Sequence, residues 1–158
     1  MKKQTWKIYL LSILFTEAVG ALSGWLTRDA AALYGEIVSK PRFSPLAPVF
    51  PVVWTILFAL MGIGIARIFL APASAARSRS LSLFLLQLLF NFCWSIIFFN
   101  LHAFGPAFLW LLLLWILLLL MILSFRQVDP TAAKLQIPYL LWVSFAAYLN
   151  LGVWLLNR

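Results

Sequence analysis

Polar and aromatic side chains recur at helical spacing inside two long apolar stretches, and these residues are the best suited to chemistry. Gln87, Asn91 and Ser95 follow one another at i, i+4 and i+8, so a helix would carry all three on one face. A second stripe with this spacing comprises Trp142, Ala146, Asn150 and Trp154. Amide and indole N–H groups can donate hydrogen bonds in a dry site, and indole rings can stack on a flat ligand. The two stripes therefore predict a ligand site between helices.

A purely structural role of the polar groups is the alternative interpretation. A hydrogen bond from Asn91 or Asn150 to another helix would contribute only about 0.6–2 kcal/mol in a membrane, and for either residue alone this role has equal weight. Glu17 is the only acid within an apolar stretch. It could bridge in protonated form to a Ser or Thr, or belong to a proton path, and the lack of an intramembrane Lys, Arg or His favours the bridge.

The sequence offers little for metal, thiol or acid–base catalysis. His102 is the only histidine, so a metal or haem site would have a single imidazole ligand. Cys93 is the only cysteine, which excludes an internal disulfide and a thiolate cluster. We therefore expect no metal site and no obligatory cofactor, and we expect binding to dominate over catalysis.

The composition defines the class of protein. Of 158 residues, 65% are hydrophobic and 10% are charged, whereas a soluble domain has roughly 45–50% apolar and about 25% charged residues. The chain is therefore expected to be an integral membrane protein. The net charge of +8 comes from cations at the ends of apolar runs, with no basic stripe, so we expect no nucleic-acid partner.

Five apolar runs are long enough to cross a hydrocarbon core of about 30 Å as helices. They cover residues 6–26, 52–70, 81–100, 106–125 and 135–157, approximately. The short connections leave no room for a soluble domain. The expected fold is all-α, a five-transmembrane-helix bundle that forms a single membrane domain over residues 1–158.

A proline-rich loop over residues 27–51 precedes the second helix. Pro41, Pro45, Pro48 and Pro51 stiffen it, and Pro51 suits the first turn of the helix. Trp54 would then lie one turn into the helix, beneath the loop. Because nothing polar interrupts residues 107–123, we expect the first, second, third and fifth helices to enclose the site, the loop to cover it, and the fourth helix to face lipid or a second subunit.

Seven of the eight tryptophans fall into two groups. Those near the ends of spans resemble residues of the interfacial aromatic belt, namely Trp6, Trp25, Trp110 and Trp154. Trp54, Trp94 and Trp142 are the better candidates for a pocket.

Cations predict the orientation in the membrane. Eight lie on the side of the N-terminus: Lys2, Lys3, Lys7, Arg67, Arg77, Arg79, Arg126 and Lys134. Four lie on the other side: Arg28, Lys40, Arg42 and Arg158. By the positive-inside rule the N-terminus is cytoplasmic, and the C-terminus and the proline-rich loop face outward.

Three blocks of residues together resemble a known family. The blocks comprise Lys40-Pro41, Phe43, Ser44, Pro45, Val49-Phe50, Val53-Trp54, Leu57-Phe58 and Met61-Gly62; then Phe90-Asn91, Trp94-Ser95 and Phe98-Phe99; then Pro138-Tyr139, Trp142, Leu149-Asn150, Trp154 and Leu156-Asn157. In this order they resemble the tryptophan-rich sensory protein and translocator protein family (TspO/MBR), whose animal members are peripheral-type benzodiazepine receptors. The first and fourth helices carry little of the signature.

The resemblance implies a homodimeric five-helix bundle whose pocket binds tetrapyrroles such as protoporphyrin IX and, in some members, cholesterol or isoquinoline carboxamides. It implies a ligand-binding set of Trp54, Phe58, Asn91, Trp94, Trp142, Ala146 and Asn150, and a lid that includes Pro41, Phe43, Pro45 and Phe50. Trp142 is similar to a residue needed for the light-dependent oxidative porphyrin breakdown of some bacterial members, which would make it catalytic. Cations near the mouth, Lys40 or Arg42, could bind ligand carboxylates.

The sequence also departs from the family pattern. Leu46, Ala47 and Pro48 replace a region that usually contains a second proline and a tryptophan, and Phe58 lacks the hydroxyl of the usual tyrosine. After Tyr148 the next cation is Arg158, too distant for the proposed cholesterol motif. We expect a tetrapyrrole-binding sensor in the cytoplasmic membrane of a bacterium. The alternatives are a transporter of porphyrins or other amphiphiles such as sterols, and a purely structural partner protein.

Overall fold

The structure, a computed structural model, describes residues 2–158, with side chains from residue 4 onward. Within this part of the chain every element is a helix: α1 (Lys2–Ile37), α2 (Val49–Leu70), α3 (Ala75–Ser95), the short π-helix η1 (Ile96–Asn100), α4 (Phe104–Val128), α5 (Pro130–Leu135) and α6 (Ile137–Leu156). Five helical segments are long and apolar enough to cross a membrane, with α3 continuing into η1 and α5 into α6. The prediction of an all-α membrane bundle with five spans is confirmed.

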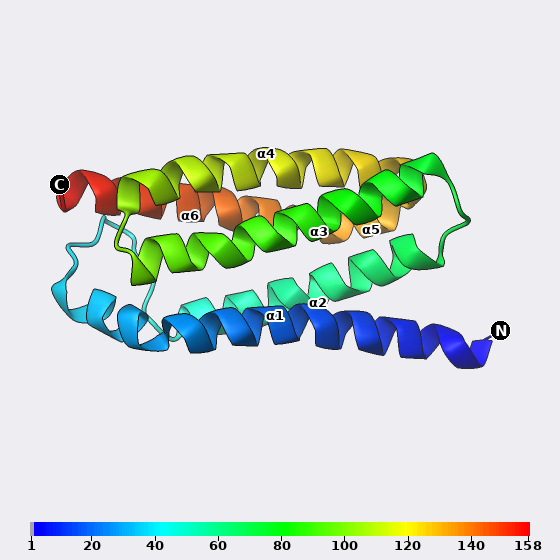
Figure 1. The fold of residues 1–158 in the computed structure, drawn as a ribbon, viewed down its shortest axis with the longest axis horizontal. Helices are drawn as coiled ribbons and strands as arrows, with labels where there is room; N and C mark the ends of the chain where they lie inside the picture. Colours follow the sequence, from blue (N-terminus) through cyan, green and yellow to red (C-terminus); the bar gives the residue numbers. More distant parts are fainter. Residues whose placement is uncertain (1) are drawn as a thin grey trace.

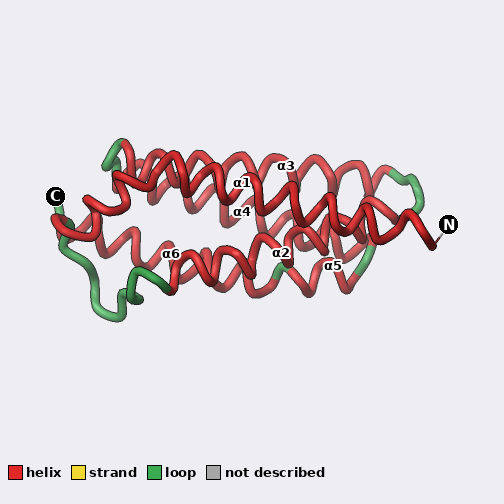
Figure 2. The backbone as a smooth tube through the Cα atoms, turned by 90° about the horizontal axis from the view of Figure 1, so that it is seen from below, coloured by secondary structure: helices red, strands yellow, loops and turns green. Residues whose placement is uncertain are grey.

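The helices lie side by side along one long axis (Figure 1). The N-terminus lies at one end of the bundle, together with the α2–α3 and α4–α5 connections. The C-terminus and the loop over residues 38–48 lie at the other end, and Figure 2 shows this loop as an irregular strap beside α6. The two groups of cations therefore belong to opposite ends of the bundle, although the side chains of Lys2 and Lys3 lie outside the described ones.

The first helix is longer than predicted. Its expected end near residue 26 is wrong, because α1 continues to Ile37. Residues 27–37 contain three consecutive alanines and no proline, and alanine has the highest helix propensity. The chain leaves the helix only as it approaches Pro41. The lid is therefore shorter than the predicted 27–51 and comprises residues 38–48, and the last turns of α1 become a further wall beside it.

The ends of the other helices differ from the predicted ends by fewer residues. α2 begins at Val49, just ahead of Pro51, which lies in its first turn. The last span contains a break that the hydropathy does not show: α5 ends at Leu135, and α6 begins at Ile137. Pro138 occupies the first turn of α6, where its missing N–H costs no helical hydrogen bond.

α4 has two different faces. Leu111, Leu114, Leu118 and Met121 are fully buried in the bundle core, where α4 packs along α3 and α6. The opposite face remains exposed, for example at Leu113 and Leu120. α4 thus supports the neighbouring helices with one face and leaves an apolar outer face, and whether this face meets lipid or a second subunit stays a prediction.

The glycines of α1 and α2 differ in how closely the neighbouring helix approaches them. A Cβ atom added to Gly20 would lie 2.4 Å from the ring of Phe58, so Gly20 does permit a close approach of α2. A Cβ atom added to Gly24 would meet no atom of another segment within 4 Å. The closer backbone approach is at Gly62 of α2, where an added Cβ would lie 2.5 Å from the Cα of Ile13. α1 and α2 therefore pack through a glycine of each helix.

Candidate functional site

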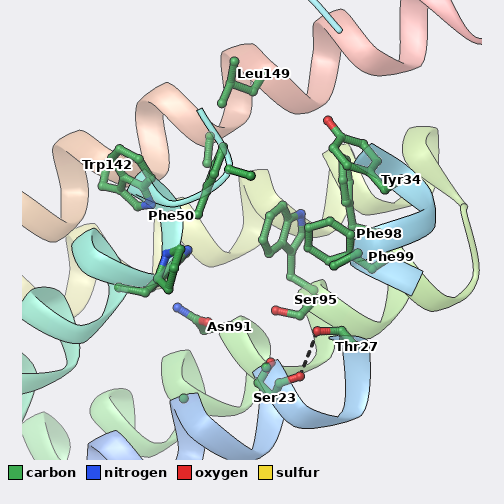
Figure 3. A pocket seen from close by; sticks show the side chains of 18 of the residues that line it. Ser23, Thr27, Tyr34, Phe50, Asn91, Ser95, Phe98, Phe99, Trp142 and Leu149 are labelled. Atoms are coloured by element: carbon green, nitrogen blue, oxygen red, sulfur yellow. Dashed lines mark hydrogen bonds between the residues drawn. The ribbon is translucent and has the colours of Figure 1, made fainter. Parts of the chain in front are cut away.

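A cavity of about 560 Å³ lies in the half of the bundle that contains the lid loop and the C-terminus. Figure 3 shows its lining from close by. Residues of α1, the lid loop, α2, α3 with η1, and α6 line it, and none of its lining residues comes from α4. The prediction that the first, second, third and fifth spans surround a space covered by the loop is confirmed, and binding of a ligand in that space stays a prediction. Its volume falls within the range of about 300–1,000 Å³ that is usual for pockets of drug-sized ligands.

The structure brings together the residues proposed to bind a ligand. All of them line the cavity: Trp54, Phe58, Asn91, Trp94, Trp142, Ala146 and Asn150. Among the lid residues, Pro45 and Phe50 line it as well, whereas Pro41 and Phe43 do not. Phe43 has a positive φ of 64° and is 84% exposed, so the turn carries its ring away from the cavity. Pro41 instead packs against Gly152 of α6, where it holds the lid against the bundle.

Trp94 and Asn150 are engaged with each other. The indole N–H of Trp94 donates to Oδ1 of Asn150 over 3.1 Å, and Nδ2 of Asn150 donates to the carbonyl oxygen of Phe104 over 2.8 Å. One amide thus connects α3, α6 and the start of α4. Although both residues border the cavity, their hydrogen bonds primarily fix the packing of these helices.

Asn91 heads a buried chain of hydrogen bonds. Its Nδ2 donates to the hydroxyl of Tyr139 over 2.5 Å, and that hydroxyl donates to Oε1 of Gln87 over 3.0 Å. Gln87 and Tyr139 are completely buried. Asn91 thus lies at the boundary between this chain and the cavity, and its Oδ1 remains free for a ligand.

Sequence reasoning missed the role of Tyr139. The only signal for it was its place in the Pro138-Tyr139 pair of the family pattern, because a single tyrosine in an apolar helix does not reveal which polar groups face it. The sequence did show that Gln87 and Asn91 share one face of α3, and this face is the one that meets Tyr139.

The indole N–H groups of Trp54 and Trp142 have no hydrogen-bond partner among the described residues. Both rings are fixed by aromatic contacts. The Trp54 ring lies 5.6 Å from that of Phe58 and 6.1 Å from that of Tyr139, centroid to centroid. The Trp142 ring meets that of Phe50 edge to face at 5.9 Å. α2 and α6 thus form an aromatic wall with two indole N–H groups that are free among the described residues.

Charged groups border the cavity at two positions. Nζ of Lys40 donates to the carbonyl oxygen of Gly35 over 3.1 Å and lies 5.5 Å from the ring centroid of Tyr34, at the lid end. Arg42 does not line the cavity. Glu17 lines it further along α1 and makes no hydrogen bond or ion pair with any described residue. The expected bridge from Glu17 to a Ser or Thr is therefore wrong.

Part of the α1 wall also escaped sequence reasoning. Ser23, Thr27 and Tyr34 line the cavity, but the two latter residues follow the predicted end of the helix. Tyr34 packs against Phe98 and Phe99, with centroids 5.4 Å away in both cases. The position of this wall depends on the actual length of α1.

These features define a polytopic membrane protein with an aromatic-rich cavity between its helices, beside the loop over residues 38–48. The chain belongs to the TspO/MBR family, whose model matches residues 12–155. It is 37% identical to the tryptophan-rich protein TspO of Chlorobaculum tepidum, with 89% of each chain covered. It is 32% identical to protein CrtK of Rhodobacter capsulatus, with 95% of this chain and 91% of the relative covered. It is 35% identical to the translocator protein of Ovis aries, with 77% of this chain and 73% of the relative covered.

Proposed function

We propose that the protein is a membrane receptor or sensor that binds a tetrapyrrole such as protoporphyrin IX in the cavity. The observation that carries the proposal is the aromatic wall of Trp54, Phe50 and Trp142, with two indole N–H groups that lack a partner. A flat macrocycle gains stacking and edge-to-face contacts on such a wall. The two free indole N–H groups can donate hydrogen bonds to the ligand, and Oδ1 of Asn91 can accept one.

Lys40 supports a ligand that carries carboxylates. Its ammonium group lies at the lid end of the cavity, held by the carbonyl oxygen of Gly35 and the ring of Tyr34. An ammonium group has three donors, so Lys40 retains capacity for an anionic oxygen. We therefore propose that the propionates of the porphyrin face the lid and that the macrocycle extends towards Asn91.

The test is a titration of purified protein with protoporphyrin IX, followed by tryptophan fluorescence. We expect saturable quenching. Trp54→Phe removes one free donor and Asn91→Ala removes the amide, and each should weaken binding about three- to tenfold, as expected for about 0.5–1.5 kcal/mol per hydrogen bond. Trp115→Phe is the matched control, because Trp115 lies outside the cavity and bonds Ser144. Quenching that does not saturate would refute the proposal.

Transport of porphyrins or other amphiphiles such as sterols is the second candidate. The name of the Ovis aries relative, translocator protein, favours transport, whereas the name of a Cereibacter sphaeroides relative, tryptophan-rich sensory protein, favours sensing. Transport requires access from both sides of the membrane, whereas the cavity lies towards one end of the bundle. Flux of porphyrin across proteoliposomes would show a transporter, while saturable binding without flux would show a receptor.

Three narrower proposals accompany this function. The protein lies in the cytoplasmic membrane of a bacterium with its N-terminus cytoplasmic, as the distribution of cations favours. It forms a homodimer and accepts isoquinoline carboxamides in the same cavity, as the family resemblance implies. Trp142 promotes light-dependent breakdown of bound porphyrin by holding the macrocycle while the excited porphyrin and oxygen supply the reactive species.

A further inference from the structure

The cavity has a second wall whose chemistry differs from that of the aromatic wall. Ser23 and Thr27 of α1 and Ser95 of α3 lie together on one side, away from Trp142 and Phe50 (Figure 3). Thr27 donates its hydroxyl hydrogen to the carbonyl oxygen of Ser23 over 2.9 Å. We define these three residues as the hydroxyl wall.

Two hydroxyls of this wall have no partner. Ser23 is only 8% exposed, yet neither its Oγ nor that of Ser95 makes a hydrogen bond with any described residue. In a helix a serine hydroxyl commonly bonds the carbonyl oxygen one turn back, as Ser82 of α3 does with Ser78 over 3.1 Å. Neither hydroxyl oxygen is among the buried side-chain atoms without a partner, so both are open to the cavity that they line. Both hydroxyls therefore remain available to something inside the cavity.

The position along α1 indicates which part of a ligand would reach this wall. The ammonium group of Lys40 is anchored at Gly35, and twelve residues separate Gly35 from Ser23, about 18 Å at 1.5 Å per residue. A ligand with carboxylates at Lys40 therefore turns its opposite edge towards Ser23 and Ser95. In protoporphyrin that edge carries two vinyl groups, which cannot form hydrogen bonds.

We infer that Ser23 and Ser95 form a subsite for a hydroxyl or carbonyl oxygen on the ligand edge opposite the carboxylates. The inference rests on the proposed function and deepens it: the cavity favours tetrapyrroles with an oxygenated edge over those with a purely hydrocarbon edge. Each serine can donate to such an oxygen and can accept from a hydroxyl. Glu17, further along the same helix and equally without a partner, extends the polar character of this side.

The test compares two porphyrins that differ only at this edge. Haematoporphyrin IX carries hydroxyethyl groups where protoporphyrin IX carries vinyl groups. We expect the wild-type protein to bind haematoporphyrin about three- to tenfold more tightly in a fluorescence titration. The double variant Ser23→Ala, Ser95→Ala should lose this preference and retain its affinity for protoporphyrin within about twofold. Because the ratio of the two affinities is measured on the same sample, a loss of folded protein cancels.

Ser82→Ala is the matched control, because Ser82 lies on the same helix as Ser95, outside the cavity, and bonds its own helix. It should leave the ratio unchanged. An equal affinity of the wild-type protein for both porphyrins, or an unchanged ratio in the double variant, would overturn the subsite while leaving porphyrin binding intact. Failure of both porphyrins to bind saturably would overturn the proposed function and the subsite with it.

Discussion

At the scale of single residues, the cavity separates side chains that hold the structure from those that are free for a ligand. Trp94 and Asn150 bond each other, and Asn91 uses one N–H on Tyr139. Trp54 and Trp142 keep their N–H groups free within the described chain. Identical residue types on similar stripes thus have different roles, and the bonding partner, which the sequence does not show, decides between them.

Trp142 gives the prediction that belongs to this scale. Trp142→Phe removes the indole that meets Phe50 and borders the cavity. If the indole holds the porphyrin for oxidation, the rate of light-dependent porphyrin loss per bound porphyrin should fall at least about tenfold, because small misplacements of a reacting group are costly. The measurement is the decay of the porphyrin absorption band under constant illumination in air. Trp115→Phe should decay as the wild type does, and an equal rate in Trp142→Phe would end the catalytic proposal.

At the scale of elements, one residue of the α4–α5 connection, Asp129, holds the start of α5 and the end of α2 together. Asp129 accepts hydrogen bonds from the backbone N–H groups of Thr131 and Ala132 at 2.8 and 3.1 Å, and so caps α5. It also forms an ion pair with Arg67 of α2 at 2.9 Å. Burial opposes ionisation of Asp129, but these hydrogen bonds and the guanidinium group outweigh it and lower the pKa of the carboxyl below its ordinary value.

Because the pKa of Asp129 is lower in the folded protein, its contribution to the free energy of unfolding decreases as the pH falls. The ionised form contributes fully above the unfolded pKa of about 4, and the contribution is lost as the pH falls through the lower folded pKa. Asp129→Asn keeps the cap but removes the charge, and should lower the free energy of unfolding by about 1 kcal/mol at pH 7. The difference from wild type should shrink towards pH 3 in thermal unfolding followed by circular dichroism in detergent.

Asp129→Ala provides the comparison, because it removes the cap as well as the charge. It should be less stable than Asp129→Asn at every pH, since the loss of an N-cap costs about 0.5–2 kcal/mol. A difference between Asp129→Asn and wild type that stays constant from pH 7 to pH 3 would contradict the assigned pKa direction.

Hydropathy and the spacing of polar residues predicted the membrane-spanning helices well, but they did not predict which side chains form hydrogen bonds with each other. The five spans and the cavity between four of them follow from long apolar runs and from polar residues at i, i+4 and i+8. The extension of α1 to Ile37 does not follow from the hydropathy. Residues 27–37 favour a helix, but they are too polar to be predicted as part of a membrane span. The free hydroxyl of Ser23 and the chain through Tyr139 depend on contacts between distant segments, which one sequence cannot reveal.

At the scale of the whole molecule, the cavity depends on how α1 packs against α2. The two helices are in close contact over one part of their length and leave space between them over another. Thr16 of α1 donates its hydroxyl hydrogen to the carbonyl oxygen of Phe58 over 2.7 Å, a contact that crosses between the two helices. Beside it, Gly62 faces the backbone of Ile13, while a Cβ atom added to Gly24 on the cavity side would meet no atom of another segment within 4 Å. One end of the α1–α2 pair is thus packed to contact, and the other leaves room for a ligand.

The two glycines therefore predict opposite outcomes for the same chemical change. A Cβ at Gly62 would lie 2.5 Å from the Cα and 2.8 Å from the N of Ile13, and these backbone atoms can yield only if α1 moves as a body. Gly62→Ala should lower the free energy of unfolding by about 1–3 kcal/mol, the usual cost of overpacking. Gly24→Ala should be neutral or slightly stabilising, because alanine favours a helix and the space is empty. Thermal unfolding of both variants in detergent measures the contrast, and equal stabilities would show that α1 is not held against α2 at Gly62.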